Sequence, residues 1–127
     1  MTWSHLREMI KKYVSAYNHF DIDGMLECFA DECIFKSVSG GRCTVTCNGK
    51  SQLRELAAQS AAYFLERTQQ ITNWIISDSQ ATIEVQYRAV LKRDLPNGLK
   101  AGEELSLLGV SIFRFDGDKI TELTDYS

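Results

Sequence analysis

The stretch YVSAYNHFDIDGMLECFADECIFKSVSG, residues 13–40, decides the expected fold because it joins a helix, a break, a second helix and a strand. Apolar residues recur at three- and four-residue intervals before and into this stretch, which predicts a first helix over residues 3–20. The break FDIDG offers Asp21 or Asp23 as the N-cap of a short second helix, residues 24–30.

The stretch ends on an alternating run, residues 32–38, which predicts a strand with Phe35 and Ser37 on one face. A turn-rich link follows at residues 39–50, with room for a short hairpin arm. Apolar residues at helical spacing then predict a second long helix over residues 49–66.

Beyond residue 67 the apolar period changes from 3.6 to 2, so the rest of the chain is expected to form strands. They are expected at residues 69–77, 81–94, 103–115 and 119–126. In the second, one face carries Ile83, Val85, Tyr87, Ala89 and Leu91, and the other carries Glu84, Gln86 and Arg88. Helices followed by antiparallel strands predict one α+β domain over residues 1–127, with the helices packed on one face of a curved antiparallel sheet.

The bulk composition excludes several classes of protein. The chain has 127 residues, a net charge of −3 and no run of basic residues, so nucleic acid is not an expected partner. No apolar run reaches the roughly 18 residues that a membrane-spanning helix needs. The N-terminal residues lack the apolar core of a signal peptide, which predicts a cytoplasmic protein that does not bind membranes.

Four cysteines, Cys28, Cys33, Cys43 and Cys47, follow the spacing C-x4-C-x9-C-x3-C. Zinc sites are typically built from tighter C-x2-C pairs, so we expect reduced thiols and no metal. No glycine-rich phosphate loop is present, and no nucleotide or other cofactor is expected.

The order of elements and several local motifs resemble the nuclear transport factor 2-like superfamily. This superfamily includes ketosteroid isomerases, SnoaL-like polyketide cyclases, limonene epoxide hydrolase and scytalone dehydratase. The resemblance covers nearly the whole chain and is carried by residues 13–40, by GKSQLRE at residues 49–55 and by FRFDGDKITELTDY at residues 113–126. It identifies the fold more specifically than the function, because this fold hosts many activities.

The resemblance implies a cone in which the sheet curls around the helices and encloses a largely apolar pocket for a small hydrophobic ligand. The pocket is expected to be lined by Tyr13, Tyr17, Phe29, Phe35, Ser37, Leu56, Tyr63, Trp74, Ser111 and Phe113. Members of the superfamily commonly form homodimers through the outer sheet face, here the face of Glu84, Gln86 and Arg88. A plain solvated face is the alternative for these three residues.

By resemblance to ketosteroid isomerases, Tyr13 falls at the oxyanion tyrosine, Ser37 at the general base and Ser111 at the second acid. A neutral serine cannot replace a carboxylate base. The ketosteroid isomerase mechanism is therefore not expected. Tyr13 also has a simpler explanation as an aromatic residue of the core.

SnoaL-like cyclases and scytalone dehydratase imply histidines on late strands, and this chain has only His5 and His19, both in or next to the first helix. Asp125 is the residue that can stand at the cyclase aspartate. The Asp–Arg–Asp cluster of limonene epoxide hydrolase is not matched, since Val90 follows two residues after Arg88.

Two functions therefore stay open. The first is a small-molecule-binding protein with a mostly apolar pocket and without the ketosteroid isomerase acid/base pair. If it is an enzyme, we expect an isomerase, cyclase, dehydratase or hydrolase with Tyr13 and Asp125 as catalytic residues. The second is a non-catalytic dimerisation or protein-interaction module, which predicts a filled cone.

Overall fold

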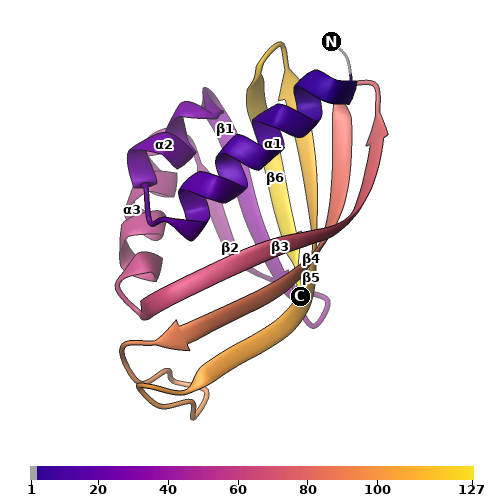
Figure 1. Cartoon of the computed structure of the whole chain (residues 1–127). Coiled ribbons are helices and arrows are strands. Elements are labelled where there is room, and N and C mark those ends of the chain that lie inside the picture. The colour runs from indigo at the N-terminus through magenta and orange to yellow at the C-terminus, as the bar shows by residue number, and fades with distance from the viewer. Residues whose placement is uncertain (1–2) are drawn as a thin grey trace.

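The computed structural model describes residues 3–127, which form three helices and one curved sheet. Figure 1 shows the helices on the concave side of the sheet, with α1 lying across it. The helices are α1 (Trp3–Asn18), α2 (Ile22–Glu27) and α3 (Lys50–Ala61). The strands are β1 (Phe29–Ser39), β2 (Arg42–Asn48), β3 (Phe64–Ser77), β4 (Gln80–Leu91), β5 (Glu104–Asp116) and β6 (Lys119–Tyr126). The predicted α+β fold is confirmed.

The six strands lie in the order β2-β1-β6-β5-β4-β3. Their pairings are antiparallel except for β1 and β6, which run parallel, so the sheet is mixed. The parallel pair joins the first strand in the sequence to the last. A pairing at that distance leaves no trace in local periodicity, and the sequence therefore predicted antiparallel neighbours only.

Helix α1 ends two residues before its predicted limit because Phe20 adopts a left-handed conformation with φ of 59°. The N–H of Asp21 donates to the carbonyl of Ala16 at 2.9 Å, and that of Phe20 donates to Tyr17 at 3.2 Å. These two bonds form a Schellman motif, a common way to end a helix. Phe20 takes the place in this motif where glycine is usual.

The other two helices also differ from their expected limits. Asp21 caps α2 by accepting a 3.0 Å bond from the N–H of Gly24, as one of the two predicted caps. Phe29 and Ala30 lie in β1 rather than α2, because Phe29 pairs with Ile120 of β6. Helix α3 ends at Ala61 since β3 pairs with β4 from its first residues. The link at residues 39–50 contains β2, the optional hairpin arm.

The inner sheet face forms most of the core together with the buried stripe of α1, which includes Leu6, Ile10 and Tyr13. Cross-strand register places Ser37 of β1 beside Asp125 of β6, and Asp125 beside Ser111 of β5. One inward-facing row thus joins the two serines through an aspartate.

No helix within residues 3–127 is long and apolar enough to cross a membrane.

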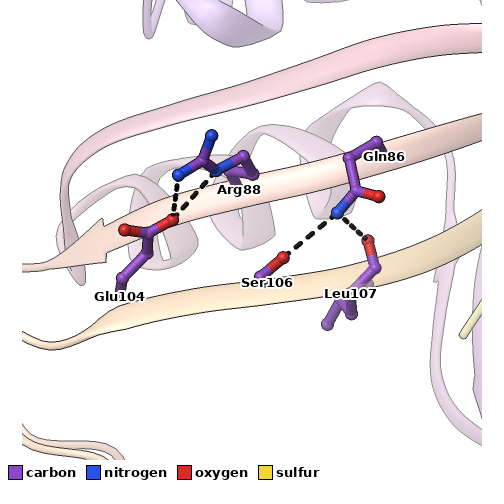
Figure 2. Close-up of polar contacts among 5 residues, drawn as sticks. All are labelled: Gln86, Arg88, Glu104, Ser106 and Leu107. Atoms are coloured by element: carbon purple, nitrogen blue, oxygen red, sulfur yellow. Dashed lines mark hydrogen bonds and ion pairs between the residues drawn. The ribbon is translucent and has the colours of Figure 1, made fainter.

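The outer face of β4 and β5 carries polar side chains that bond to each other. Figure 2 shows Arg88, whose Nε donates to Oε1 of Glu104 at 2.9 Å, and Gln86, whose amide donates to the hydroxyl of Ser106 at 3.1 Å. The prediction that Gln86 and Arg88 face outward is confirmed. These side chains form hydrogen bonds within the chain, so this part of the outer face needs no second protein to satisfy them.

The four cysteines are free, and three of them, Cys28, Cys33 and Cys47, are buried while Cys43 is exposed. Burial raises the pKa of each of the three buried thiols, which keeps them protonated. Within residues 3–127, no group of three or more His, Cys, Asp or Glu side chains is arranged to hold a metal ion.

Candidate functional site

A cavity of about 280 Å³, here called the main cavity, lies between the helices and the inner sheet face. It is lined by Tyr13, Tyr17, Met25, Phe35, Ser37, Val45, Leu53, Leu56, Ala57, Ser60, Arg67 and Asp125. Five of the residues expected to line the pocket do so: Tyr13, Tyr17, Phe35, Ser37 and Leu56. Asp125, expected as a catalytic residue, joins them at the same cavity.

Phe29 and Phe113 were expected in the pocket lining and instead lie in the packed core, each with 1% of its surface exposed. Both pack edge-on against the ring of Tyr13, with centroid distances of 5.5 and 5.9 Å. They therefore form the layer behind Tyr13 rather than the cavity wall. The resemblance implied that both residues line the pocket, but it could not give their depth in the fold.

Tyr63 and Trp74 also lie outside the main cavity. Tyr63 follows the end of α3, where the guanidinium of Arg93 lies 6.0 Å from its ring. Trp74 of β3 is half-buried beneath Arg7 of α1, with 4.9 Å from the guanidinium carbon to the ring centroid. Both aromatic rings contact arginine side chains instead of the cavity.

Asp125 is the acidic residue of the main cavity. The hydroxyl of Ser111 donates to its Oδ1 at 2.7 Å. The residue is half-buried because it borders open space, and its carboxyl lies deep enough that desolvation raises its pKa to about 6, while the bond from Ser111 acts in the opposite direction. A carboxyl with this pKa can both accept and donate a proton near neutral pH.

A second cavity, of about 200 Å³, adjoins the main one. It shares Tyr17, Ser37 and Asp125 with the main cavity and also borders Ser111, which places that predicted pocket residue here. Asp125 therefore borders both cavities, and its Oδ1 atom accepts the hydrogen bond from Ser111.

Three tyrosines, Tyr13, Tyr17 and Tyr87, border the two cavities that Asp125 also borders. The hydroxyl of Tyr17 donates to that of Tyr87 at 3.0 Å. Burial raises the pKa of Tyr13, Tyr17 and Tyr87 above the usual value, and the nearby Asp125 carboxylate raises them further. The three phenols are therefore neutral groups that can donate hydrogen bonds but cannot act as bases.

Sequence reasoning missed Arg67, a main-cavity residue of β3 that is only 3% exposed. Its Nε donates to the carbonyl of Tyr17 at 2.9 Å. Its guanidinium carbon lies 3.7 Å from the ring centroid of Tyr17 and 4.5 Å from that of Phe20. In the sequence, Arg67 falls in the gap between the predicted helix and the predicted strand, and nothing local marks it as buried.

The histidines take no part in the main cavity. His19 is exposed at the end of α1, and its Nδ1 lies 2.7 Å from the carbonyl of Ser15. His19 therefore lies away from the site, which leaves Asp125 as the main acid/base candidate of the cavity.

A curved sheet that encloses helices and a cavity, with an acid on its last strand, defines the class of cone-shaped α+β proteins to which ketosteroid isomerase-like folds belong. The chain belongs to the SnoaL-like domain family, whose model matches residues 10–123. No curated protein matches the chain in sequence.

Solved structures share the fold at low sequence identity. A protein from Catenulispora acidiphila with a ketosteroid isomerase-like fold, in complex with trimethylamine, is 20% identical with a TM-score of 0.77, over 94% of this chain and 85% of that one. A candidate polyketide cyclase from Silicibacter is 21% identical with a TM-score of 0.78, over 99% and 90%. AclR, a candidate hydroxylase from Streptomyces galilaeus, is 14% identical with a TM-score of 0.79, over 98% and 89%. Such identities establish the fold alone.

Proposed function

We propose that the protein binds a small, mostly apolar molecule in the main cavity and that Asp125 exchanges a proton with it. The observation that carries this proposal is the position of Asp125, an acid with a pKa of about 6 that borders the main cavity. Perturbed carboxyl groups in cavities are typical of acid/base sites.

The chemistry follows from the groups around Asp125. Above a pH of about 6 its carboxylate can take a proton from a bound molecule, and below it the carboxylic acid can donate one. Ser111 fixes the carboxyl through its bond to Oδ1. The neutral phenol of Tyr13 is suited to donate a hydrogen bond to an oxygen of the bound molecule, which keeps Tyr13 as the second candidate.

The proposed site differs from that of a ketosteroid isomerase. By resemblance, the two acid positions of that enzyme fall at Ser37 and Ser111, and the register places Asp125 between these two serines. The carboxyl of Asp125 would thus be the single acid/base group of a site in which the isomerase has two acids. Proteins with this fold include candidate polyketide cyclases and hydroxylases, which supports a small organic substrate.

The volume of the main cavity supports a ligand of modest size. Ligand pockets commonly measure roughly 300–1,000 Å³, and this one, at about 280 Å³, lies at the small end. A non-catalytic module with a filled cone fits this volume less well.

Free buried thiols support the proposed cytoplasmic location, because such compartments keep cysteines reduced.

Calorimetric titration with 2-naphthamide, a neutral flat molecule, tests the binding proposal. Ala57 of α3 is buried and lines the main cavity, whereas its neighbour Ala58 is exposed. We expect Ala57→Phe to abolish binding by filling the cavity, and Ala58→Phe to leave it unchanged. Binding to Ala57→Phe that is as tight as binding to the wild-type protein would reject the main cavity as the site.

We also propose that two copies associate through the outer sheet face. Leu108 of β5 is 74% exposed there. It borders a hollow shared with Val110 and Tyr126 of the neighbouring positions on β5 and β6. Apolar residues at such a place favour a contact with a second copy, while the polar pairs of Figure 2 would form its solvated rim.

A further inference from the structure

Arg67 is a buried cation that has no carboxylate partner within ion-pair distance among residues 3–127. The ion pairs in this part of the chain involve other, more exposed side chains. A buried charge is costly unless it is paired, and an arginine side chain stays protonated at physiological pH. The position of Arg67 at the main cavity therefore needs an explanation.

The end of α1 holds the guanidinium in place. The carbonyl of Tyr17 accepts a bond from Nε of Arg67, and the rings of Tyr17 and Phe20 lie against the guanidinium plane. The ring of Phe20 reaches this place from a left-handed backbone conformation that bulky residues rarely adopt. These contacts orient the cation and use its Nε, but none of them brings a full negative charge.

Asp125 is not the counter-ion of Arg67. The two side chains border the same cavity, and yet they form no ion pair. A paired carboxyl would have a lowered pKa, whereas that of Asp125 is raised by burial. The main cavity thus contains a cation and, separately, an acid.

The two Nη groups remain for a ligand. Nη2 has a weak contact with the sulfur of Met25 at 4.0 Å, and no other protein atom within the described residues accepts a bond from either Nη. Two adjacent Nη groups match the two oxygens of a carboxylate, the arrangement in which arginine binds this group most strongly.

We infer that the molecule bound in the main cavity carries a carboxylate, which the Nη1 and Nη2 groups of Arg67 bind while its apolar body contacts Leu53, Leu56 and Phe35. This inference rests on the proposed function and adds the substrate class: a small aromatic or alicyclic carboxylic acid. The competing explanation is that Arg67 only stabilises the C-terminal end of α1, in which case the charge of the ligand has no effect on its affinity.

Calorimetric titration with 2-naphthoate and 2-naphthamide separates these explanations, because the two molecules share a body and differ in charge. At pH 7 we expect the wild-type protein to bind naphthoate at least tenfold more tightly than naphthamide. Arg67→Gln should lose this preference and keep the binding of naphthamide. Arg88→Gln, which removes an exposed arginine of the outer face, should keep the preference.

The possible failures are distinguishable. Equal affinities of the wild-type protein for the two molecules would overturn the inference and leave the proposed binding function intact. A preference for naphthoate that survives Arg67→Gln would overturn the role of Arg67. Binding of neither molecule would overturn the proposed function and the inference with it. If Arg67→Gln does not fold, as seen by circular dichroism, the comparison on the wild-type protein decides, with Arg67→Lys as the second variant.

Discussion

The hydroxyl of Ser111 on β5 donates a 2.7 Å hydrogen bond to Oδ1 of Asp125, the residue directly opposite on β6. By resemblance, Ser111 occupies a position at which an isomerase has an acid. Here its hydroxyl instead binds the carboxyl of Asp125 on the adjacent strand. The bond favours the charged form of the carboxyl and so opposes the effect of burial. The balance of these two effects sets the proton affinity of the site.

Ser111→Ala is expected to raise the pKa of Asp125 above 6, by about one unit if the bond contributes on the order of 1.5 kcal/mol to the charged form. Carbon-13 NMR of labelled aspartate side chains as a function of pH measures this value. Ser37→Ala is the matched control, since Ser37 lies opposite Asp125 on the other side. An unchanged pKa of Asp125 in Ser111→Ala, or equal shifts in both variants, would contradict this role of the Ser111 hydroxyl.

Asp125→Asn is expected to stabilise the fold at pH 7.5, because the native state then no longer holds a buried carboxylate. Burial raises the pKa of Asp125 from 3.8 to about 6, so its ionisation lowers the free energy of unfolding as pH rises through this window. The gain at pH 7.5 should be on the order of 2 kcal/mol, allowing for water in the cavity.

Urea unfolding of both proteins at pH 4.5 and 7.5 measures this difference. Below the unfolded-state value of 3.8 the wild-type carboxyl is protonated in both states, so the gain of Asp125→Asn should shrink as pH falls from 7.5 towards 4.5. A variant that is less stable at pH 7.5, or whose gain does not depend on pH, would show that Asp125 is not a buried titrating group.

The thiols should differ in reactivity according to their burial. Only Cys43 is exposed, whereas Cys28, Cys33 and Cys47 are buried and have raised pKa values. We expect 5,5′-dithiobis(2-nitrobenzoate) to react quickly with one thiol per native chain and with all four in urea. Cys43→Ser should abolish the fast reaction. Two or more fast thiols in the native protein would contradict this packing.

Leu108→Glu is expected to convert a dimer to a monomer if the outer sheet face is the interface, because it places a charge at an exposed apolar position. Sedimentation velocity at tens of micromolar protein measures the change in mass. Ala58→Glu on α3 is the control and should stay dimeric. A monomeric wild-type protein under these conditions would refute the proposed dimer.

The sequence predicted the fold and the direction of many side chains, because both follow from local periodicity. The period of two in β1 predicted that Phe35 and Ser37 share a face, whereas the place of Ser37 in the pocket and the role of Asp125 were implied by the family resemblance. The placement of β6 beside β1 follows from contacts between the two ends of the chain and could not be predicted in this way.

The composition of the cavity was less predictable than its existence. The Nε of Arg67 binds the carbonyl of Tyr17, 50 residues earlier in the chain. Its guanidinium also packs on the ring of Phe20, which takes the usual place of glycine at the end of α1. The depth of a side chain in the fold was also not predictable. Phe113 and Tyr13 both face inward and pack on each other, but of these two only Tyr13 lines the main cavity. Such differences depend on packing between distant segments, which periodicity does not describe.

The pH–rate profile of a reporter reaction tests whether Asp125 transfers a proton within the main cavity. In 5-nitrobenzisoxazole a base removes the proton of the ring C–H while the N–O bond breaks, which yields a coloured cyanophenolate without any cofactor. We expect saturable turnover whose kcat rises with pH around a midpoint near 6 and falls roughly 100-fold or more in Asp125→Asn. Equal rates in the two proteins, or a rate with no midpoint in this range, would contradict this role of Asp125.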